Sequence, residues 1–269
     1  MGDHLESIHD TIQRTVPEMN IQIPTPKGDM PAYLRLPTGT GPWPGVVVLH
    51  DALGMSLDAH AQADWLASEG FLALTPDLFH WSNRWRCLVA LFGDCGRFLS
   101  DIDLARAWLA VHPDCTGKTG AIGFCMGGGF ALMLADGHGF SVASVNYGAF
   151  TRGNERTLPR ACPIVGSYGA QDHWPRVNDA PPILESALTA AGIDHDIKVY
   201  PEAGHGFMNQ HGDLGLFDRV MTTIANAEYH EESTRDARAR IVLFFRKHLL
   251  DGPRLEEPDS ATTATPAAE

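Results

Sequence analysis

The sequence has no long apolar run and few cysteines, and it is poor in basic residues. No stretch approaches the roughly 18 consecutive apolar residues of a membrane helix, and the first residues lack the basic start and apolar core of a signal peptide. The five cysteines are odd in number and scattered, so we expect reduced thiols and a cytoplasmic location. With 20 Lys and Arg against 33 Asp and Glu, the formal net charge is −13. This charge argues against nucleic acids and anionic membranes as partners.

The length and composition fit one folded domain with two flanking segments. Apolar residues make up 44% and charged residues 20% of the 269 positions, which is ordinary for a globular protein. We place a single α/β domain at residues 19–250, after an N-terminal extension at residues 1–18. Residues 1–16 predict either a short docked amphipathic helix or a frayed terminus. Residues 251–269, rich in Pro, Ala, Thr and acids, predict a disordered tail.

Apolar, β-branched runs alternate with helical patterns along most of the chain. This alternation predicts a mostly parallel central sheet with helices on both faces and an antiparallel hairpin at one edge. The aromatic-rich residues 79–96 are expected to be irregular. The expected strands are 20–23, 32–36, 45–50, 71–75, 118–122, 142–147, 161–168 and 196–200. The expected helices are 59–69, 98–110, 128–135, 182–191 and 228–250.

Residues 123–129, Gly-Phe-Cys-Met-Gly-Gly-Gly, directly follow an expected strand and carry the most informative pattern of the chain. They fit the nucleophile elbow G-x-S-x-G, with Cys125 in place of the serine. The elbow holds its central residue in a strained strand-to-helix turn, and Gly123 and Gly127 meet its demand for small neighbours. The helix that follows would aim its N-terminal amides at the sulfur and favour the thiolate. The alternative is a glycine-rich turn with an ordinary buried cysteine.

An acid and a histidine follow this turn in the order that a nucleophile elbow requires. Asp172 comes after the expected strand 161–168, and His205 lies in the loop after the last expected strand. Right-handed crossovers place the carboxyl ends of parallel strands at one edge of a sheet, so we expect Cys125, Asp172 and His205 to converge there. Glu202 is a weaker candidate for the acid because it lies on the same loop as His205.

With these residues the chain resembles the dienelactone hydrolase family of the α/β-hydrolase superfamily. The three main matching segments are residues 123–128 (Gly-Phe-Cys-Met-Gly-Gly), 169–174 (Gly-Ala-Gln-Asp-His-Trp) and 201–207 (Pro-Glu-Ala-Gly-His-Gly-Phe). Two shorter ones are residues 50–54 (His-Asp-Ala-Leu-Gly) and 75–78 (Thr-Pro-Asp-Leu). The resemblance spans about residues 20–250 and implies an α/β-hydrolase fold. It also implies that Cys125 is the nucleophile, His205 the base and Asp172 the orienting acid.

The resemblance also supplies expectations for the surroundings of the thiol. The amide of Met126, the residue after the nucleophile, is one expected oxyanion donor, and by family analogy the amide of Ala52 is the second. Family members that cleave dienelactone carry an arginine four positions after the histidine, where this chain has Asn209. They carry a glutamate where this chain has Asp51. That arginine helps to hold a substrate carboxylate, so its absence here makes dienelactone a less favoured substrate. Both departures are compatible with hydrolase chemistry.

Four further side chains are candidates for tuning the thiol or binding the substrate. Asp51 either tunes the thiol or caps a turn. Arg84 and Arg86 either bind a substrate carboxylate or form a solvated pair. Trp174 either lines a pocket or packs in the core. Each alternative is compatible with the sequence, so the choice depends on where the side chains lie.

These residues together predict a hydrolase of small esters or lactones that needs neither cofactor nor metal. The thiolate would attack the carbonyl, a thioester acyl-enzyme would form, and water would free the acid. A metal site at His205, His211 and Asp213 is a weaker alternative because a closed ligand set is absent. The other functions considered are a non-catalytic small-molecule-binding protein on the same fold and a thioesterase or acyl transferase. The sequence leaves the oligomeric state open.

Overall fold

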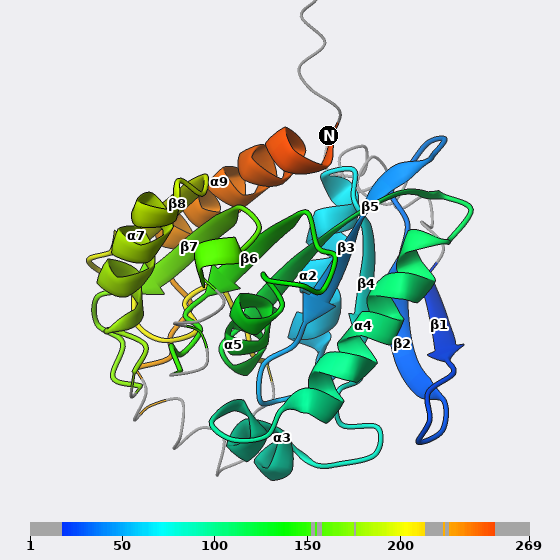
Figure 1. The fold of residues 1–269 in the computed structure, drawn as a ribbon, viewed down its shortest axis with the longest axis horizontal. Helices are drawn as coiled ribbons and strands as arrows, with labels where there is room; N and C mark the ends of the chain where they lie inside the picture. Colours follow the sequence, from blue (N-terminus) through cyan, green and yellow to red (C-terminus); the bar gives the residue numbers. More distant parts are fainter. Residues whose placement is uncertain are drawn as a thin grey trace, which may run out of the picture.

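A single sheet with helices on both faces organises the chain (Figure 1). The computed structural model describes residues 18–151, 154, 158–174, 176–212, 223 and 226–250. Apart from residue 18, the expected extension at 1–18 lies outside these ranges, as does the expected tail at 251–269. Within the described ranges no helix is long and apolar enough to cross a bilayer.

The eight-stranded sheet is antiparallel at one edge and parallel elsewhere, as the sequence predicts. Its strand order is β1-β2-β4-β3-β5-β6-β7-β8. β1 and β2 form the expected hairpin, β2 pairs antiparallel with β4, and the remaining pairs are parallel. Valines 46 to 48 in β3 are fully buried, as a strand covered on both faces requires. The strands are β1 (Glu18–Ile23), β2 (Met30–Arg35), β3 (Trp43–Leu49), β4 (Leu72–Pro76), β5 (Cys115–Phe124), β6 (Val142–Asn146), β7 (Ile164–Gly169) and β8 (His195–Tyr200).

Helices cover both faces of the sheet. The helices are α2 (Leu57–Ser68), α3 (Arg84–Leu91), α4 (Gly96–Ala110), α5 (Met126–Met133), α7 (Ala180–Ala191) and α9 (Glu231–Leu249), with a 3₁₀ turn at Leu158–Arg160. α2 and α9 share one face, where Arg246 bonds Glu69 at 3.1 Å, and α4 and α5 lie on the other (Figure 1). α7 ends at Gly192 with a φ of +68°, the left-handed stop that the sequence predicts.

Helix α3 occupies the middle of residues 79–96, so the expectation of an irregular segment there is wrong. Asn83 caps the helix, because its side chain accepts a hydrogen bond from the amide of Arg86 at 3.1 Å. Leu91 at its C-terminal end packs on α5, where a Cβ added to Gly129 would lie 2.7 Å from the leucine side chain. The buried residues follow helical spacing: Cys87, Ala90 and Leu91. This short apolar pattern is interrupted by exposed aromatic and basic residues, which hide it in the sequence.

Candidate functional site

Cys125 stands at the turn between β5 and α5 in a strained backbone conformation. Its φ of +53° and ψ of −113° lie in a region that L residues rarely adopt, at a typical cost of about 1–3 kcal/mol. A Cβ on Gly123 would lie 2.0 Å from the carbonyl oxygen of Gly127, across the turn as predicted. A Cβ on Gly127 would instead lie 2.1 Å from the carbonyl oxygen of Leu49 at the end of β3. Both glycines are therefore required by close backbone approach, and the turn has the geometry of a nucleophile elbow.

The amino terminus of α5 begins directly after Cys125. The amide of Gly129 makes the first intrahelical bond, to the carbonyl of Cys125 at 3.2 Å. The amides of the first three helical residues precede that bond and are the donors that a helix leaves unsatisfied at its start. These donors and the positive end of the helix dipole favour negative charge beside the turn. Met126, the predicted oxyanion donor, is the first of the three.

The structure brings the three predicted side chains together, although they follow three different strands. Nε2 of His205 lies 3.0 Å from Sγ of Cys125, and Nδ1 of His205 lies 2.7 Å from Oδ2 of Asp172. The side chain of Asp172 is fully buried, and that of His205 is 7% exposed. The loops after β5, β7 and β8 thus meet at the carboxyl edge of the sheet. Glu202, the weaker candidate acid, is exposed.

Two opposing effects set the charge of His205. Burial lowers its pKa, but the negative charge on Cys125 and the hydrogen bond that the ring donates to Asp172 outweigh burial and raise the pKa to about 10. A pKa above neutral means that the imidazole carries its second proton at neutral pH, between the sulfur of Cys125 and the carboxylate of Asp172. The arrangement can therefore present a nucleophilic sulfur and a proton donor at neutral pH.

Aromatic rings and one backbone amide hold the acid and the imidazole in place. The ring of Trp174 stacks on that of His205, with centroids 5.7 Å apart and planes at 25°. Tyr147 contacts the imidazole edge-on, with centroids 5.4 Å apart and planes at 65°. The amide of Trp174 also donates to Oδ1 of Asp172 at 2.7 Å. Of the two alternatives for Trp174, the structure therefore shows a ring that packs on the site itself.

The loop after β3 forms a turn around Asp51, a few residues before α2. The amide of Leu53 donates to Oδ1 of Asp51 at 2.8 Å, and the amide of Gly54 donates to its carbonyl at 3.2 Å. Oδ2 of Asp51 lies 3.1 Å from Nε2 of His211. The turn-capping alternative for Asp51 is thus observed, and the ion pair with His211 is a contact that the sequence did not indicate. Ala52, the predicted second oxyanion donor, lies within this turn and is half-buried.

Asn209 is buried, and its side chain lies between Tyr147 and Asp58. Its Oδ1 accepts from the hydroxyl of Tyr147, and its Nδ2 donates to Oδ2 of Asp58 on α2. Asn209 is 5% and Asp58 is 6% exposed. Both polar ends of this amide are engaged by the protein, at the position where the resemblance implied an arginine in dienelactone-cleaving members. Sequence reasoning missed Tyr147 and Asp58, because an acid in a first helical turn and an aromatic residue after a strand are both ordinary features.

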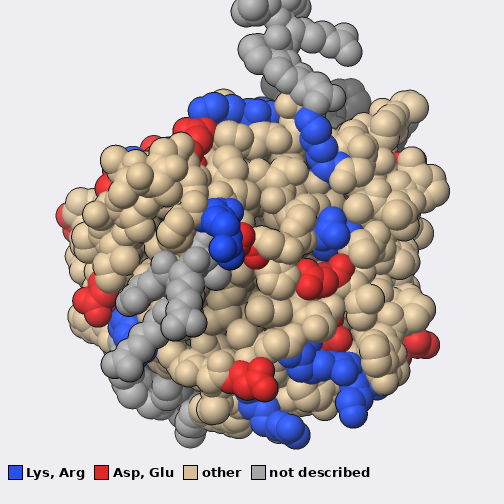
Figure 2. Space-filling view, viewed as in Figure 1, with Lys and Arg blue, Asp and Glu red and all other residues tan. Residues whose placement is uncertain are grey.

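Arg84 and Arg86 lie on α3, at the lower edge of the molecule in Figure 1. The guanidinium of Arg84 lies over the ring of Trp85 at 5.8 Å, and that of Arg86 lies over Trp81 at 5.9 Å. Lys and Arg atoms gather at this edge in the charge view (Figure 2). Arg86 is exposed and Arg84 is half-buried. Both side chains are thus observed in cation–π contacts with tryptophan rings of the same segment.

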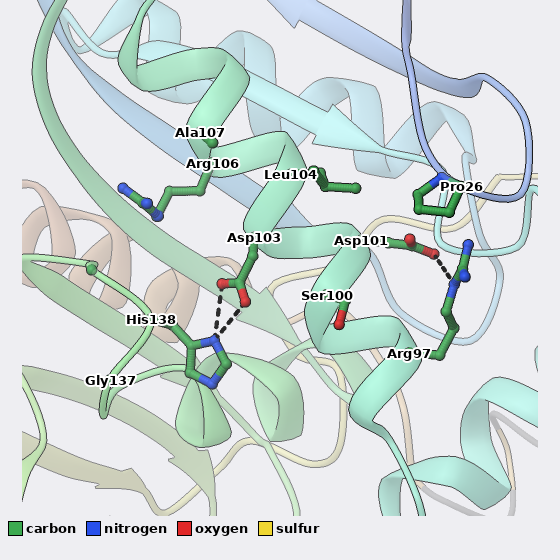
Figure 3. Close-up of a pocket in the computed structure, with 11 residues that line it drawn as sticks. Pro26, Arg97, Ser100, Asp101, Asp103, Leu104, Arg106, Ala107, Gly137 and His138 are labelled. Atoms are coloured by element: carbon green, nitrogen blue, oxygen red, sulfur yellow. Dashed lines mark hydrogen bonds and ion pairs between the residues drawn. The ribbon is translucent and has the colours of Figure 1, made fainter.

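A hollow of about 780 Å³ lies along α4 (Figure 3). In its lining His138 bonds Asp103 at 2.9 Å and Arg97 bonds Asp101 at 3.4 Å. None of the three converging side chains lines it. Among the residues that the structure describes, no group of three or more His, Cys, Asp and Glu could hold a metal ion. Asp213, part of the metal alternative, lies outside the described ranges.

Comparison with known proteins gives the same family from both sequence and structure. The pattern of the dienelactone hydrolase family matches residues 30–249. A carboxymethylenebutenolidase of Rhodococcus opacus is 30% identical over 251 residues, covering 85% of this chain and 90% of that protein. A crystal structure from Klebsiella pneumoniae subsp. pneumoniae superposes with a TM-score of 0.70 at 27% identity, covering 86% of this chain and 98% of the other. A metagenomic dienelactone hydrolase-like phosphotriesterase also has a TM-score of 0.70, and at 20% identity it supports the α/β-hydrolase fold alone.

Proposed function

Because the chain belongs to the dienelactone hydrolase family, and so is a carboxylic ester hydrolase, we propose that it cleaves a small ester or lactone through Cys125, His205 and Asp172. One observation carries this proposal: the imidazole of His205 lies 3.0 Å from the sulfur and 2.7 Å from the carboxylate. Nucleophile, base and orienting acid need these distances. The strained turn at Cys125 adds support, because an ordinary buried cysteine has no need of it.

The first half-reaction forms a thioester. The thiolate of Cys125 forms a bond to the carbonyl carbon, and the negative charge moves onto the carbonyl oxygen. As the carbon–oxygen ester bond breaks, the imidazolium of His205 gives its Nε2 proton to the leaving oxygen. Asp172 keeps the other ring proton on Nδ1 and so fixes the orientation of the ring. The raised pKa of His205 suits this step because the proton is already in place.

Two backbone amides would stabilise the negative oxygen. The amide of Met126 belongs to the unsatisfied start of α5. In the turn after β3, the amides of Leu53 and Gly54 both fold back onto Asp51. That leaves the amide of Ala52 as the donor that the turn can offer to a ligand. Loss of one such donor typically costs roughly 3 kcal/mol of transition-state stabilisation.

The second half-reaction consumes water. Neutral His205 takes a proton from the water as its oxygen bonds the thioester carbon, and the carbon–sulfur bond then breaks. The acid leaves, and the thiolate and imidazolium are restored, so no proton or electron is left unbalanced. This scheme operates in the cytoplasm, where thiols stay reduced, and it involves no nucleic acid or membrane partner.

A short p-nitrophenyl ester tests the proposal. Wild type should release nitrophenol in a burst and carry an acyl thioester on Cys125, detectable by mass spectrometry of the quenched protein. Cys125→Ala should show neither the burst nor the adduct. Cys95→Ala is the matched control, because Cys95 contacts Met133 at 3.5 Å, outside the site. Equal turnover by Cys125→Ala and wild type would refute the mechanism, and tight binding without turnover by wild type would favour a binding protein instead.

A matched pair of substrates distinguishes an esterase from a thioesterase. An oxygen ester and a thioester of the same acyl group, measured side by side, isolate the leaving group. We expect the oxygen ester to be cleaved with the higher kcat/KM, since the imidazolium of His205 can protonate a leaving oxygen. A clear preference for the thioester would reassign the activity to the thioesterase class.

A further inference from the structure

A buried carboxylate on a neighbouring helix binds the loop that carries the base. Asp58 lies in the first turn of α2 and is 6% exposed. Its Oδ1 accepts from the amide of Gln210 at 2.6 Å, and its Oδ2 accepts from Nδ2 of Asn209. The start of a helix favours a negative charge, so the carboxylate is suited to this position. The loop after β8 is thus held by a helix about 150 residues earlier in the sequence.

The hydrogen bonds fix the direction of every donor in this network. A carboxylate only accepts, so the amide nitrogen of Asn209 must face Asp58 and its oxygen must face Tyr147. Burial raises the pKa of Tyr147 well above its usual value, and the nearby carboxylates of Asp58 and Asp51 act in the same direction. The phenol therefore keeps its proton and donates it. The result is one polarised chain from Tyr147 through Asn209 to Asp58.

Tyr147, at the end of the network opposite Asp58, contacts the proposed base His205. Tyr147 is fully buried, with a φ of +41°, and its amide donates to the carbonyl of Ser167 at 2.8 Å. Its ring meets the edge of the imidazole of His205, on which Trp174 also stacks. The rings of Tyr147 and Trp174 thus fix the plane of the imidazole. The hydroxyl of Tyr147 is connected to Asp58 through the side chain of Asn209.

We propose that Asp58 is a positioning residue for the base. Through Asn209 and Tyr147 it holds the imidazole of His205 in the plane in which Nε2 faces the sulfur of Cys125. α2 begins a few residues after the turn that contains Ala52, the proposed oxyanion donor. Asp58 therefore also fixes the position of that turn relative to the loop that carries His205. The catalytic consequence rests on the proposed hydrolase mechanism, whereas the orientation of the imidazole does not.

Other contacts keep the base loop folded when Asp58 is changed. The side chain of Gln62 donates to the carbonyl of Met208 at 2.9 Å, and the hydroxyl of Thr234 donates to that of Phe207 at 2.8 Å. These bonds anchor backbone carbonyls and do not touch the ring of Tyr147. Substitution of Asp58 by asparagine should therefore loosen the imidazole while leaving the chain folded.

The test compares Asp58→Asn with a control on the same helix. Asp64 also bonds a tyrosine hydroxyl, that of Tyr33 at 2.8 Å, but lies away from the site and is 44% exposed. We expect Asp58→Asn to lower kcat between about 10- and 100-fold with little change in KM, the range that displaced catalytic groups produce. The pKa of His205, followed by NMR, should be lower than in wild type, because a loosened ring makes weaker contacts with Cys125 and Asp172. Asp64→Asn should match wild type in both measurements.

A double substitution that exchanges the side chains of Asp58 and Asn209 separates a loss of imidazole orientation from a general loss of fold stability. In Asp58→Asn with Asn209→Asp, the new asparagine can still accept from the amide of Gln210 and donate to the new aspartate. That aspartate can still accept from Tyr147, so the exchange should restore most of the lost kcat and the wild-type pKa of His205. The proposal is overturned if folded Asp58→Asn keeps kcat within twofold of wild type, or if the pKa of His205 is unchanged. The titration needs no substrate, so it decides the inference even if wild type cleaves no ester.

Discussion

Trp174 contacts both His205 and Asp172. Its indole ring lies on the imidazole of His205 at 5.7 Å, and its backbone amide donates to Asp172 at 2.7 Å. The first contact depends on the side chain, whereas the second survives any substitution except proline. The two contributions can therefore be measured separately, which is rare for a residue that touches two members of one site.

Substitution of Trp174 by alanine should lower kcat about fivefold, because stacked aromatic pairs contribute roughly 1 kcal/mol. Trp174→Phe should retain most of the activity, since a benzene ring still covers the imidazole. The measurement is steady-state hydrolysis of a p-nitrophenyl ester by the three proteins, with thermal unfolding as a check that each is folded. If alanine and phenylalanine have the same effect, stacking does not contribute to positioning the base.

The elbow should tolerate no side chain at position 123. A Cβ there would lie 2.0 Å from the carbonyl oxygen of Gly127, so the backbone of the turn must shift. We expect Gly123→Ala to lose at least about 3 kcal/mol of unfolding free energy, or to fail to fold. Gly93→Ala is the matched control, because its nearest neighbour is 3.7 Å away. Urea unfolding of both variants checks the difference, and similar midpoints would show that the turn is not tightly constrained.

Local patterns predicted the parts of the structure that local physics determines. The glycines around Cys125 mark a strained turn wherever it occurs, and the apolar strands before Asp172 and His205 place those residues at the same edge of the sheet. The relation between Asp58 and Asn209 had no such signal, because the two are 151 positions apart and each is ordinary in its own segment. The pairing of Asp51 with His211 was missed for the same reason. Contacts between residues that are distant in the sequence depend on how the elements pack in the folded chain, and local sequence patterns do not reveal this packing.

The imidazole of His138, in the hollow of Figure 3, should titrate above its usual range. Its hydrogen bond with Asp103 raises its pKa, which outweighs partial burial acting in the other direction. A raised native pKa means that the pair stabilises the fold fully below pH 6.5, the ordinary pKa of histidine. The stabilisation is lost as pH rises through the native value. NMR titration of wild type and Asp103→Asn checks this. An unchanged His138 midpoint in the variant would contradict the assignment.

The five cysteines should differ sharply in reactivity towards iodoacetamide at neutral pH. Burial raises the pKa of Cys87 and Cys162 to about 12, so almost none of either thiol is ionised. Burial also raises the pKa of Cys95 and Cys115. Nε2 of His205 lies 3.0 Å from the sulfur of Cys125, and this thiol should be alkylated first.

Peptide mapping by mass spectrometry over a time course gives the order of modification. In wild type, carbamidomethylation of Cys125 should approach completion while Cys87 and Cys162 stay unmodified. His205→Asn removes the charge partner and should slow modification of Cys125 by roughly tenfold or more, the factor that corresponds to about 1.4 kcal/mol of lost thiolate stabilisation. Faster modification of any other cysteine would show that the imidazole does not activate the thiol, and the thiolate–imidazolium pair would have to be abandoned.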